Sequence, residues 1–565
     1  MERTLNSILL SDTVRERFCI GLLLVVAVFA YGNTIVNDFT NDDQLYVVNN
    51  PQVTHPTLRA LFSPNKFSLV FRPVTFGTFA LDWKIGQGFA PGFHVINLVL
   101  HAIVTLLLYM LLQRLFQGSS RGNVLALAAA LLFAVHPIHT EAVASISGRA
   151  ELLGAGFLIA GWLLHLDDRE VPALTCFALG LLSKESAIVF LPLIMIGDYV
   201  IGHWKSAFRY LRAAGITLLY LAVLWKVRGN HFGILTLSVL DNPLISLPAG
   251  PRILNALRVA WKYVGLQVYP ATLSADYSYN QIPLYTAWRY TLPAALATIA
   301  VVGCWIWTVK TRRQGLVLAG GIYMAGFAVT ANVFMPIGTI MGERLAYLPS
   351  AGFCLLVALA WNWLRERQRT LAFGVLATLI ILLGVRTLVR NRDWKNNDTL
   401  YSAQLGNAPG SAKTHQNMAL LYLNHKQFDL SRKEFETALQ IYPLGPRALA
   451  YYGVLEASQG NYQEAGRKME KAFSMVSREN PAYDEIAVNL AALYMQTGHA
   501  DGALDLLNRE IAESPEYGPA WANRAVLHYR RGETALARAD ITTALRLDPT
   551  NRQVQTLQQV ITRTN

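Results

Sequence analysis

The sequence has little charge, and that shortage narrows the classes of protein it can encode. Only 15% of its 565 residues are Asp, Glu, Lys or Arg, whereas 53% are hydrophobic. A chain this poor in charge points to a membrane protein when its apolar residues come in long blocks. They do so before about residue 390, and a polar, alanine-rich sequence follows. At this length two or more domains are expected.

Cysteine is also scarce, and its placement excludes two kinds of site. The four cysteines all lie inside apolar stretches, and none is spaced as C-x-x-C. Neither a zinc site nor a disulfide framework is indicated, so we interpret the cysteines as small core residues. The chain lacks a G-x-x-x-x-G-K motif and therefore needs no site for soluble nucleotide phosphates. A net charge of +12 is not accompanied by a basic run interleaved with aromatic residues, so we expect no nucleic-acid partner.

Apolar segments long enough, or nearly so, to cross a bilayer recur along the first part of the chain. A span needs roughly 20 predominantly apolar residues. About eleven segments qualify, at 18–37, 93–113, 123–140, 147–166, 171–183, 185–202, 211–227, 290–309, 315–335, 345–363 and 371–389. The first resembles a signal peptide ending near Ala30, but we favour an uncleaved anchor. The segment 253–270 is interrupted by Arg258 and Lys262, which suits an interfacial or re-entrant helix better than a span.

Basic clusters between these segments predict the orientation of the chain. Cytoplasmic loops carry an excess of Lys and Arg. An odd number of crossings with the N-terminus inside places five basic clusters in the cytoplasm, at 3–17, 114–121, 203–212, 310–313 and 365–369. The sequence therefore predicts an integral membrane protein with a cytoplasmic N-terminus and a non-cytoplasmic C-terminal domain. That face is the periplasmic side of a bacterial inner membrane or, in a eukaryote, the lumen of the endoplasmic reticulum.

The same topology brings charged loop residues together on the outer face. The first outer loop, 38–92, carries the adjacent Asp42 and Asp43. Charges within or beside spans are costly in hydrocarbon and usually face a cavity or a partner. The other polar candidates on this face are Arg72, His94, His136, His139, Glu141, Arg149, Lys184, Glu185, Asp276, Tyr277, Glu343 and Arg344. Their convergence predicts an active site at the outer membrane interface.

The C-terminal part is a repeat array with a period near 34, the tetratricopeptide spacing. A small residue recurs at intervals of 34, 38 and 34, at Ala419, Gly453, Ala491 and Ala525. This pattern predicts about four helix–turn–helix repeats stacked into a superhelix with a concave surface, which commonly binds extended peptide. We therefore expect a membrane domain at 1–390, a connector at 391–410 and a repeat domain at 411–565.

Seven stretches of the membrane half carry a family resemblance. The most specific is HPIHTEAVASISGRAELL, and the others are FTNDDQLYVVNNPQV, FRPVTFGTFALDW, GFHVINLVLHAIVTLLLY, SKESAIVFLP, LSADYSYNQIP and GERLAYLPSAGFCLL. Together with the trailing repeats, they resemble the transmembrane and tetratricopeptide-repeat-containing O-mannosyltransferases. That family belongs to the GT-C superfamily of polyprenyl-phosphate-sugar-dependent glycosyltransferases. The resemblance covers nearly all of residues 38–357.

The resemblance implies an all-α fold, with a polytopic helical membrane domain of GT-C type followed by a tetratricopeptide-repeat α-solenoid. It also implies a polyprenyl-phosphate sugar as donor, a protein acceptor bound by the repeats, and chemistry on the non-cytoplasmic side among membrane lipids. In GT-C enzymes an acidic residue of the first outer loop commonly acts as the base. Asp42 and Asp43 stand at that place, and which of them serves stays open. Eukaryotic relatives use dolichyl phosphate mannose, whereas a bacterial chain would use undecaprenyl phosphate, so the sugar and the lipid also stay open.

Transfer of a sugar to a hydroxyl needs a base for the proton and cations for the departing phosphate. The base is Asp42 or Asp43, for which the alternative is a helix N-cap or turn. The outer-face cations assigned to the donor phosphate are Arg72, Arg149, Lys184 and Arg344. Each is alternatively a snorkelling residue or the partner of a nearby glutamate.

The remaining candidates are assigned to donor or acceptor contacts. His136 and His139 lack the H-E-x-x-H pattern, so we expect no metal there and assign them to hydrogen bonds with the donor or to helix-end packing. Asp276 and Tyr277 line a sugar or acceptor site, or anchor the chain at the interface. We predict an inverting transfer to Ser or Thr hydroxyls. The alternatives are a lipid or glycan acceptor, and a non-catalytic membrane scaffold for an envelope complex.

Overall fold

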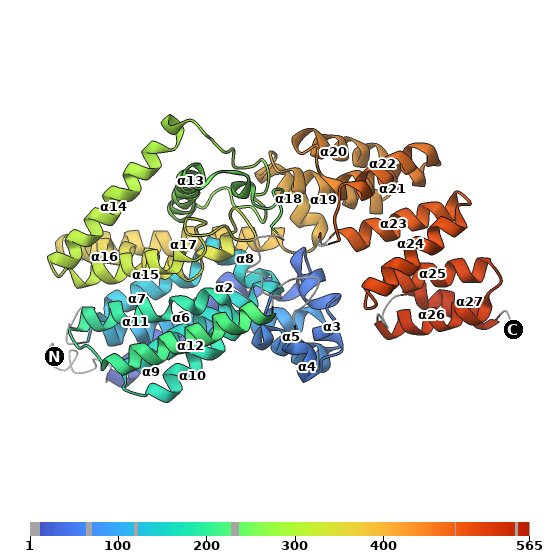
Figure 1. Cartoon of the computed structure of the whole chain (residues 1–565). Helices are drawn as coiled ribbons and strands as arrows, with labels where there is room; N and C mark the ends of the chain where they lie inside the picture. The colour runs from blue at the N-terminus through green and yellow to red at the C-terminus, as the bar shows by residue number, and fades with distance from the viewer. Residues whose placement is uncertain are drawn as a thin grey trace. The chain divides into compact units, whose positions relative to one another are not determined.

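The structure is a computed structural model that describes residues 12–63, 70–117, 122–227, 237–478, 480, 482–547 and 552–563. Every regular element in these ranges is a helix (Figure 1), which confirms the predicted all-α fold. The chain divides into two compact units, the first made of 1–277 and 282–407 and the second of 278–281 and 408–565. Arg3 and Arg121, two of the predicted orientation signals, lie outside the described residues.

Eleven helices of the first unit coincide with the predicted apolar segments. They are α2 (Asp12–Tyr31), α6 (Ala90–Leu115), α7 (Gly122–Val135), α9 (Arg149–Leu166), α10 (Glu170–Ser183), α11 (Phe190–Ile201), α12 (Ala207–Val227), α14 (Leu292–Lys310), α15 (Gln314–Ala328), α16 (Pro349–Arg367) and α17 (Arg369–Asp393). The apolar runs of the sequence therefore do form helices, and the apolar character of the unit supports a membrane protein.

By helix length and composition, the number of candidate membrane spans is smaller than the eleven that the sequence predicts. Among the described residues, six helices are long and apolar enough to cross a membrane, namely α2, α6, α9, α12, α14 and α17. A seventh results if α7 and residues 137–144, which bend by 52°, are counted as one broken span. Helices α10 and α15 are apolar but shorter. The predicted count of eleven is thus not confirmed. Helix α13 (Ala249–Val268) is not among the candidate spans, as predicted for 253–270.

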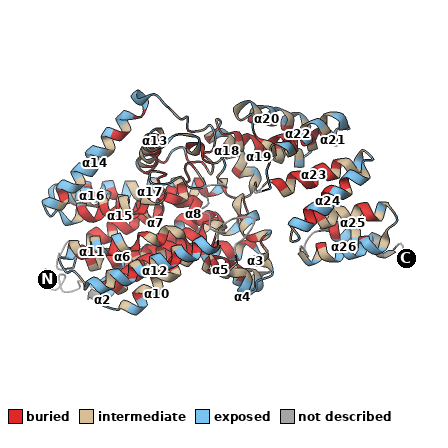
Figure 2. Cartoon of the chain, viewed as in Figure 1, coloured by how far each residue is buried: buried red, intermediate tan, exposed pale blue. Residues whose placement is uncertain are grey.

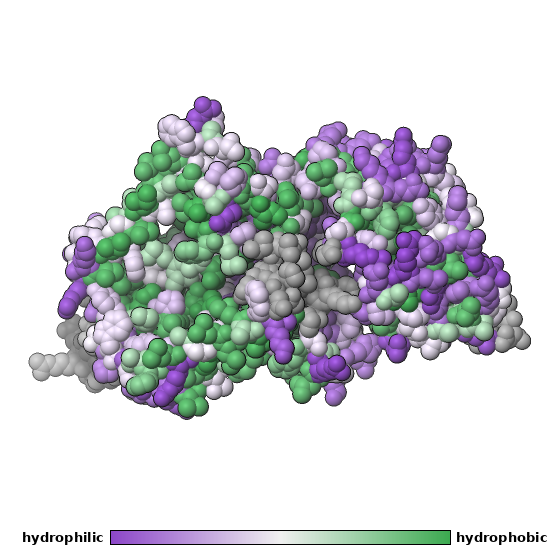
Figure 3. All heavy atoms as spheres, in the orientation of Figure 1, coloured by the Kyte–Doolittle hydropathy of each residue, from purple (hydrophilic) through white to green (hydrophobic). Residues whose placement is uncertain are grey.

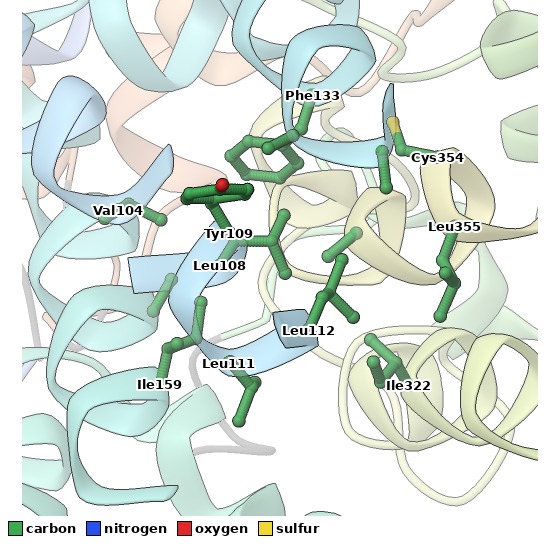
Figure 4. Close-up of a cluster of buried hydrophobic side chains, with 14 of the residues drawn as sticks. Val104, Leu108, Tyr109, Leu111, Leu112, Phe133, Ile159, Ile322, Cys354 and Leu355 are labelled. Carbon is green, nitrogen blue, oxygen red and sulfur yellow. The ribbon is translucent and has the colours of Figure 1, made fainter. Parts of the chain in front are cut away.

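The core of the first unit lies where α6, α7, α9, α15 and α16 meet. Tyr109 of α6, Phe133 of α7 and Leu355 of α16 belong to one cluster of buried side chains (Figure 4). Close approach of α15 and α16 depends on Gly352, because a Cβ there would lie 2.4 Å from the carbonyl oxygen of Ala319. Small residues of this kind allow helices in membranes to pack backbone against backbone.

The outward faces of these helices carry large apolar side chains. Examples are Phe29, Leu218, Ile299, Ile381 and Leu382. Buried residues are concentrated where helices meet, and exposed ones follow the outer faces (Figure 2). The surface over the first unit has broad hydrophobic areas, whereas the surface over the repeats is largely hydrophilic (Figure 3). Exposed apolar side chains in such numbers are expected where lipid is the solvent.

Short helical elements connect the long helices at one end of the bundle. They are η2 (Gly32–Val36), η3 (Gln44–Val48), α3 (Pro51–Thr54), α4 (Leu58–Leu61), α5 (Pro73–Gly86), η4 (Pro137–His139), α8 (Thr140–Ala144), η5 (Ile146–Gly148), η6 (Glu185–Val189) and η10 (Glu343–Ala346). Local sequence explains where some of them begin. The Asn50 side chain caps α3, and the Thr57 side chain caps α4. Five predicted site residues lie on these elements, namely His139, Glu141, Glu185, Glu343 and Arg344, and four more directly precede one of them, namely Asp43, Arg72, His136 and Lys184.

The second unit is the predicted repeat array. Its helices form four consecutive pairs and a final helix: α19 (Ala412–Asn424), α20 (Phe428–Ile441), α21 (Pro446–Ser458), α22 (Tyr462–Ser474), α23 (Tyr483–Gln496), α24 (Ala500–Glu513), α25 (Gly518–Arg530), α26 (Thr534–Leu547) and α27 (Arg552–Arg563). The recurring small residues are buried between paired helices. At Gly453 a Cβ would lie 2.6 Å from Cγ of Met469, so this position lies close to the paired helix α22.

The turn inside each repeat uses a left-handed backbone residue. These residues are Lys426, Gly460, Gly498 and Gly532, with φ between 59° and 83°. They follow the same spacing as the small residues, so the repeat period fixes the turn as well as the packing. Glycine adopts this conformation without a steric penalty, whereas Lys426 adopts it at a steric cost.

The second unit also includes a short segment from the loop after α13. The backbone of Asn280 donates to the carbonyl of Gly410 at 2.9 Å, and the backbone of Ala412 donates to the carbonyl of Tyr279 at 2.7 Å. The rings of Tyr279 and Tyr442 lie 5.2 Å apart. The first repeat therefore begins against residues 278–281, which sequence reading placed in the membrane half.

Candidate active site

The structure separates the two adjacent aspartates, and Asp43 is the buried one. Its carboxylate accepts hydrogen bonds from the backbone of Ser147 at 2.7 Å, from the backbone of Thr40 at 3.0 Å and from the Ser145 hydroxyl at 3.1 Å. Burial raises the pKa of Asp43 to about 6, although these hydrogen bonds oppose the shift. Asp43 thus fastens the first loop to the turn before α9.

Asp42 points to the other side and stays accessible, with 31% of its side chain exposed. Its Oδ2 lies 3.3 Å from Nη1 of Arg344. The same guanidinium nitrogen lies 2.5 Å from Oε1 of Glu141, and the backbone of Arg344 donates to Oε2 at 2.9 Å. Glu141 is buried and therefore holds Arg344 in place beside Asp42.

Two further ion pairs lie on neighbouring elements. Arg72 grips Glu185 with two hydrogen bonds, of 3.0 Å from Nε and 2.7 Å from Nη2. Lys184 lies 2.8 Å from Glu151, and both of these side chains are buried. Arg72 directly precedes α5 and Lys184 directly precedes η6, so each pair joins segments that are far apart in sequence. The two-pronged geometry of the first pair is the one that arginine also offers to phosphate.

Tyr46 lies where these pairs meet. Burial raises the pKa of Tyr46, the charge of Asp42 raises it further, and Arg72 and Arg344 lower it. Burial lowers the pKa of Lys184, and the charges of Arg72 and Arg344 lower it further. We call this group the Asp42 cluster; its members are Asp42, Tyr46, Arg72, Glu141, Glu151, Lys184, Glu185 and Arg344. It brings together three cations, four carboxylates and one phenol.

Arg149 lies outside this cluster, contrary to the assignment made from its position in the sequence. Its guanidinium is fully buried and donates to Asp82 at 2.5 Å, to Asn97 at 2.8 Å and to the carbonyl of Phe93 at 3.0 Å. It also lies over the ring of Phe79, 4.7 Å from the centroid. These contacts occupy the guanidinium inside the fold, so we leave Arg149 out of the candidate site.

Glu343 and Tyr277 form a second buried group. The Tyr277 hydroxyl donates to Oε1 of Glu343 at 2.8 Å, and the backbone of Ser274 donates to the same oxygen at 2.5 Å. Oε2 of Glu343 lies 3.9 Å from Nη2 of Arg390, which is also fully buried. Burial raises the pKa of Glu343 to about 7, against the opposing charge of Arg390. Asp276 is half-buried beside this group, and its backbone donates to the Ser274 hydroxyl.

The three predicted histidines are buried as well. His136 lies 3.0 Å from the carbonyl of Gln267, and His139 lies 2.6 Å from the Ser350 hydroxyl. His94 is fully buried in α6. Within the described ranges, no group of three or more His, Cys, Asp or Glu side chains could hold a metal ion. The contacts of His136 and His139 agree with packing at helix ends, which is the alternative to a role in donor binding.

The sequence did not predict three residues that interact with the predicted site residues, namely Tyr46, Asp82 and Arg390. Tyr46 lies four residues after Asp42, within a quoted motif, so its position was visible but its role was not. Asp82 lies in the largely apolar helix α5, where a carboxylate signals a buried partner. Arg390 lies in the last turn of α17 and had been taken as part of the domain boundary.

Comparison with known proteins identifies the second unit. Family models described as tetratricopeptide repeat match residues 417–475, 488–552 and 456–510. These matches cover the four helix pairs, so residues 417–552 are tetratricopeptide repeats.

Curated relatives extend the comparison to the first unit. The protein O-mannosyl-transferase F38B6.6 of Caenorhabditis elegans is 32% identical over 439 residues, which cover 75% of this chain and 62% of that protein. Human protein O-mannosyl-transferase TMTC3 is 26% identical over 594 residues, which cover 94% of this chain and 64% of that protein. The chain thus spans less than two thirds of the length of these relatives.

Among solved structures, the archaeal oligosaccharyltransferase AglB of Archaeoglobus fulgidus aligns over 76% of this chain and 60% of that chain. The identity is 13% and the TM-score 0.38, which is too low to establish a shared fold. The curated relatives confirm the resemblance predicted from the sequence: this chain is a homologue of the transmembrane and tetratricopeptide-repeat-containing protein O-mannosyl-transferases.

Proposed function

We propose that this protein is an integral membrane glycosyltransferase, which transfers a sugar from a polyprenyl-phosphate donor to a Ser or Thr hydroxyl of a protein. The observation that carries the proposal is the Asp42 cluster, in which the accessible Asp42 carboxylate is paired with Arg344 while two further cations, Arg72 and Lys184, lie on neighbouring elements. The names of the curated relatives support the reaction class. The long apolar helices support a membrane-embedded donor site.

In the proposed reaction Asp42 is the base. One of its carboxylate oxygens takes the proton of the acceptor hydroxyl as that oxygen attacks the anomeric carbon of the sugar. The bond between the anomeric carbon and the phosphate oxygen breaks, and the phosphate leaves with the electron pair. A single displacement of this kind inverts the anomeric configuration. Asp43 is a positioning residue, because its hydrogen bonds hold the loop that carries Asp42.

Arg72, Lys184 and Arg344 stabilise the departing phosphate in this scheme. Each is paired with a carboxylate in the structure, so the phosphate must take the place of at least one of these partners. Glu185 is suited to give way because 43% of its side chain is exposed, whereas Glu141 and Glu151 are buried. Arginine then keeps the same two-pronged grip on a different anion.

The repeats recruit the protein acceptor in this proposal. Tetratricopeptide arrays present an extended concave surface suited to peptide. With the N-terminus in the cytoplasm, the repeats and the Asp42 cluster both lie on the non-cytoplasmic face, where a secreted or membrane protein would arrive. An array that bound only lipid or glycan would have no use for such a surface.

The test is sugar transfer by the purified full chain in detergent. It is given a panel of polyprenyl-phosphate sugars, mannose included, and an extract of envelope or secretory proteins. Asp42→Asn should lower the rate by about 100-fold or more, the usual effect of removing a general base. Asp38→Asn is the matched control, because Asp38 is exposed in the same loop and loses the same charge.

Wild-type turnover in Asp42→Asn would show that the base lies elsewhere. Absence of transfer by the folded wild-type chain with every donor would favour the scaffold over the enzyme. Asp43→Asn should instead lower the melting temperature, since it replaces a carboxylate that accepts backbone hydrogen bonds by an amide that can accept at only one of its two positions.

A further inference from the structure

A cavity lies at the end of the membrane unit that is opposite to the Asp42 cluster. Its volume is about 390 Å³, which is in the size range of ligand pockets. It is lined by residues from the last turns of α6, α9 and α11, from the loop between α11 and α12, and from the first residue of α15. None of these residues has a part in the proposed transfer reaction, so the inference does not rest on it.

The polar side of the cavity is formed by cations, amides and the carboxylate of Asp168. Arg114, Lys205 and His203 line it together with Gln117 and Gln314. Lys205 is built into the fold, because only 5% of its side chain is exposed and its backbone donates to the Tyr210 hydroxyl at 3.0 Å. A lysine held at a cavity wall in this way offers a fixed positive charge to a ligand.

The carboxylate of Asp168, which lines the cavity, does not balance these cations. Asp168 is shared, since its Oδ1 lies 2.9 Å from Nζ of Lys205 and 2.8 Å from Nη1 of Arg209. Arg114 lies 2.9 Å from Asp167, and both are well exposed. Two of the lining residues are Lys or Arg and one is Asp, and this Asp168 is also engaged by Arg209 from outside the lining. The ligand that fits this surplus is an anion.

The other side of the cavity is apolar and marks the edge of the membrane. Leu115, Leu166, Val200 and Ile201 line it, and they close the apolar helices α6, α9 and α11. Trp204, which follows in the next loop, is 54% exposed. Tryptophan with an exposed ring is typical of the level of lipid headgroups. The cavity would therefore bind the anion at the boundary between water and hydrocarbon.

We propose that this cavity binds the phosphodiester headgroup of an anionic phospholipid. Lys205 and Arg114 bind the phosphate, and the apolar wall contacts the upper part of the acyl chains. Basic pockets between membrane helices are suited to such headgroups. A zwitterionic lipid would bring its own positive charge toward these cations and bind less well. A free phosphate would gain nothing from the apolar wall.

The test measures binding of short-chain phosphatidylglycerol, phosphatidylcholine and inorganic phosphate to the full chain in a neutral detergent. Phosphatidylglycerol should bind at least fivefold more tightly than phosphatidylcholine. Lys205→Gln and Arg114→Gln should each weaken phosphatidylglycerol binding about fivefold, the effect of one basic residue at an anionic lipid surface. Arg114→Gln also serves if Lys205→Gln does not fold, because Arg114 is at the surface.

Lys310→Gln is the matched control, since Lys310 is exposed at the same end of the bundle but does not line the cavity. It should change binding by less than about twofold. Equal binding of the two lipids would overturn the proposal. So would an equal loss in Lys310→Gln, which would indicate general surface charge. Displacement of phosphatidylglycerol by an equal concentration of inorganic phosphate would assign the cavity to a soluble anion instead.

Discussion

The membrane unit buries cations completely, whereas the described part of the repeat unit does not. In the membrane unit Arg149 and Arg390 are fully buried and lie beside buried or half-buried carboxylates. In the repeat unit the side chains of the pair Arg509–Asp505 are 60% and 66% exposed. The difference follows from the solvent. A charged side chain that faced lipid would lose its hydration, so in the membrane unit it lies inside the bundle beside a partner. A charged side chain on a repeat helix can stay hydrated at the surface.

Small residues are easier to recognise in the sequence of the repeat unit than in that of the membrane unit. In the repeats they recur with the period of the fold, so the sequence reveals them directly. In the membrane unit, a glycine such as Gly352 is needed at a single helix crossing and carries no periodic signal. Charge is therefore the informative feature of the first unit, and small residues are the informative feature of the second.

The largest effect on stability is expected from a broken buried pair. Arg149→Met removes the guanidinium and leaves Asp82 without its cation, which should cost about 3–5 kcal/mol. Arg509→Met in the repeats removes an exposed pair and should cost about 0.5 kcal/mol or less. Melting temperature in detergent is the measurement. Equal losses in the two variants would show that the membrane unit does not depend on buried charge as described.

Glu343 should make the membrane unit sensitive to pH. Its pKa of about 7 in the folded protein lies above the usual value of 4.5, so between these values the folded state binds more protons than the unfolded state. Stability should then fall as pH rises through this window, by up to about 1.4 kcal/mol per pH unit. The difference in melting temperature between pH 5 and pH 8 should shrink in Glu343→Gln.

Glu464 in the repeats is the control for this experiment. A hydrogen bond from Lys468 lowers the pKa of Glu464, so its contribution is lost only as pH falls below the usual range. Glu464→Gln should therefore leave the difference between pH 5 and pH 8 unchanged. A smaller difference in Glu464→Gln, or none of the expected change in Glu343→Gln, would contradict the assignment.

A methyl group should be tolerated at one glycine and not at the other. At Gly352 it would meet backbone atoms of α15, which cannot move aside, and we expect Gly352→Ala to cost about 1–3 kcal/mol. At Gly453 the nearest atom belongs to the flexible Met469 side chain, and alanine gains about 1 kcal/mol of helix propensity. Gly453→Ala should be near neutral by thermal melting. The reverse order would mean that the repeats are the more tightly packed unit.

The smallest effect concerns the turn of the first repeat. Lys426 adopts the left-handed conformation that glycine adopts in the other three repeats. Lys426→Gly should raise stability by about 0.5–1 kcal/mol, because glycine removes the steric penalty there. Gly460→Ala, the matched change in the second repeat, should lower stability by a similar amount. Loss of stability in Lys426→Gly would show that the lysine side chain contributes more than the turn costs.

The sequence was most informative where structure is local. Apolar runs predicted helices at all eleven places, and the small residues predicted four repeats with the correct spacing. It was least informative about charge pairs, because their partners are distant in the chain. Arg72 and Glu185 are 113 residues apart, and Arg344 and Glu141 are 203 apart. Local periodicity holds no record of such contacts, so the partner of Arg149 could not be chosen among the available carboxylates.

What the sequence determined by itself was the helical class, the repeat array and the resemblance to a family of membrane O-mannosyltransferases. Only the tertiary structure distinguishes the surroundings of Asp42 from those of Asp43. The two side chains are identical and adjacent, and they differ only in what surrounds them. Asp43 accepts hydrogen bonds from the backbone of Ile146 and Ser147, about a hundred residues away, and Asp42 faces Arg344 and solvent. Burial and hydrogen bonding distinguish chemically equal groups, and both arise only when distant segments meet.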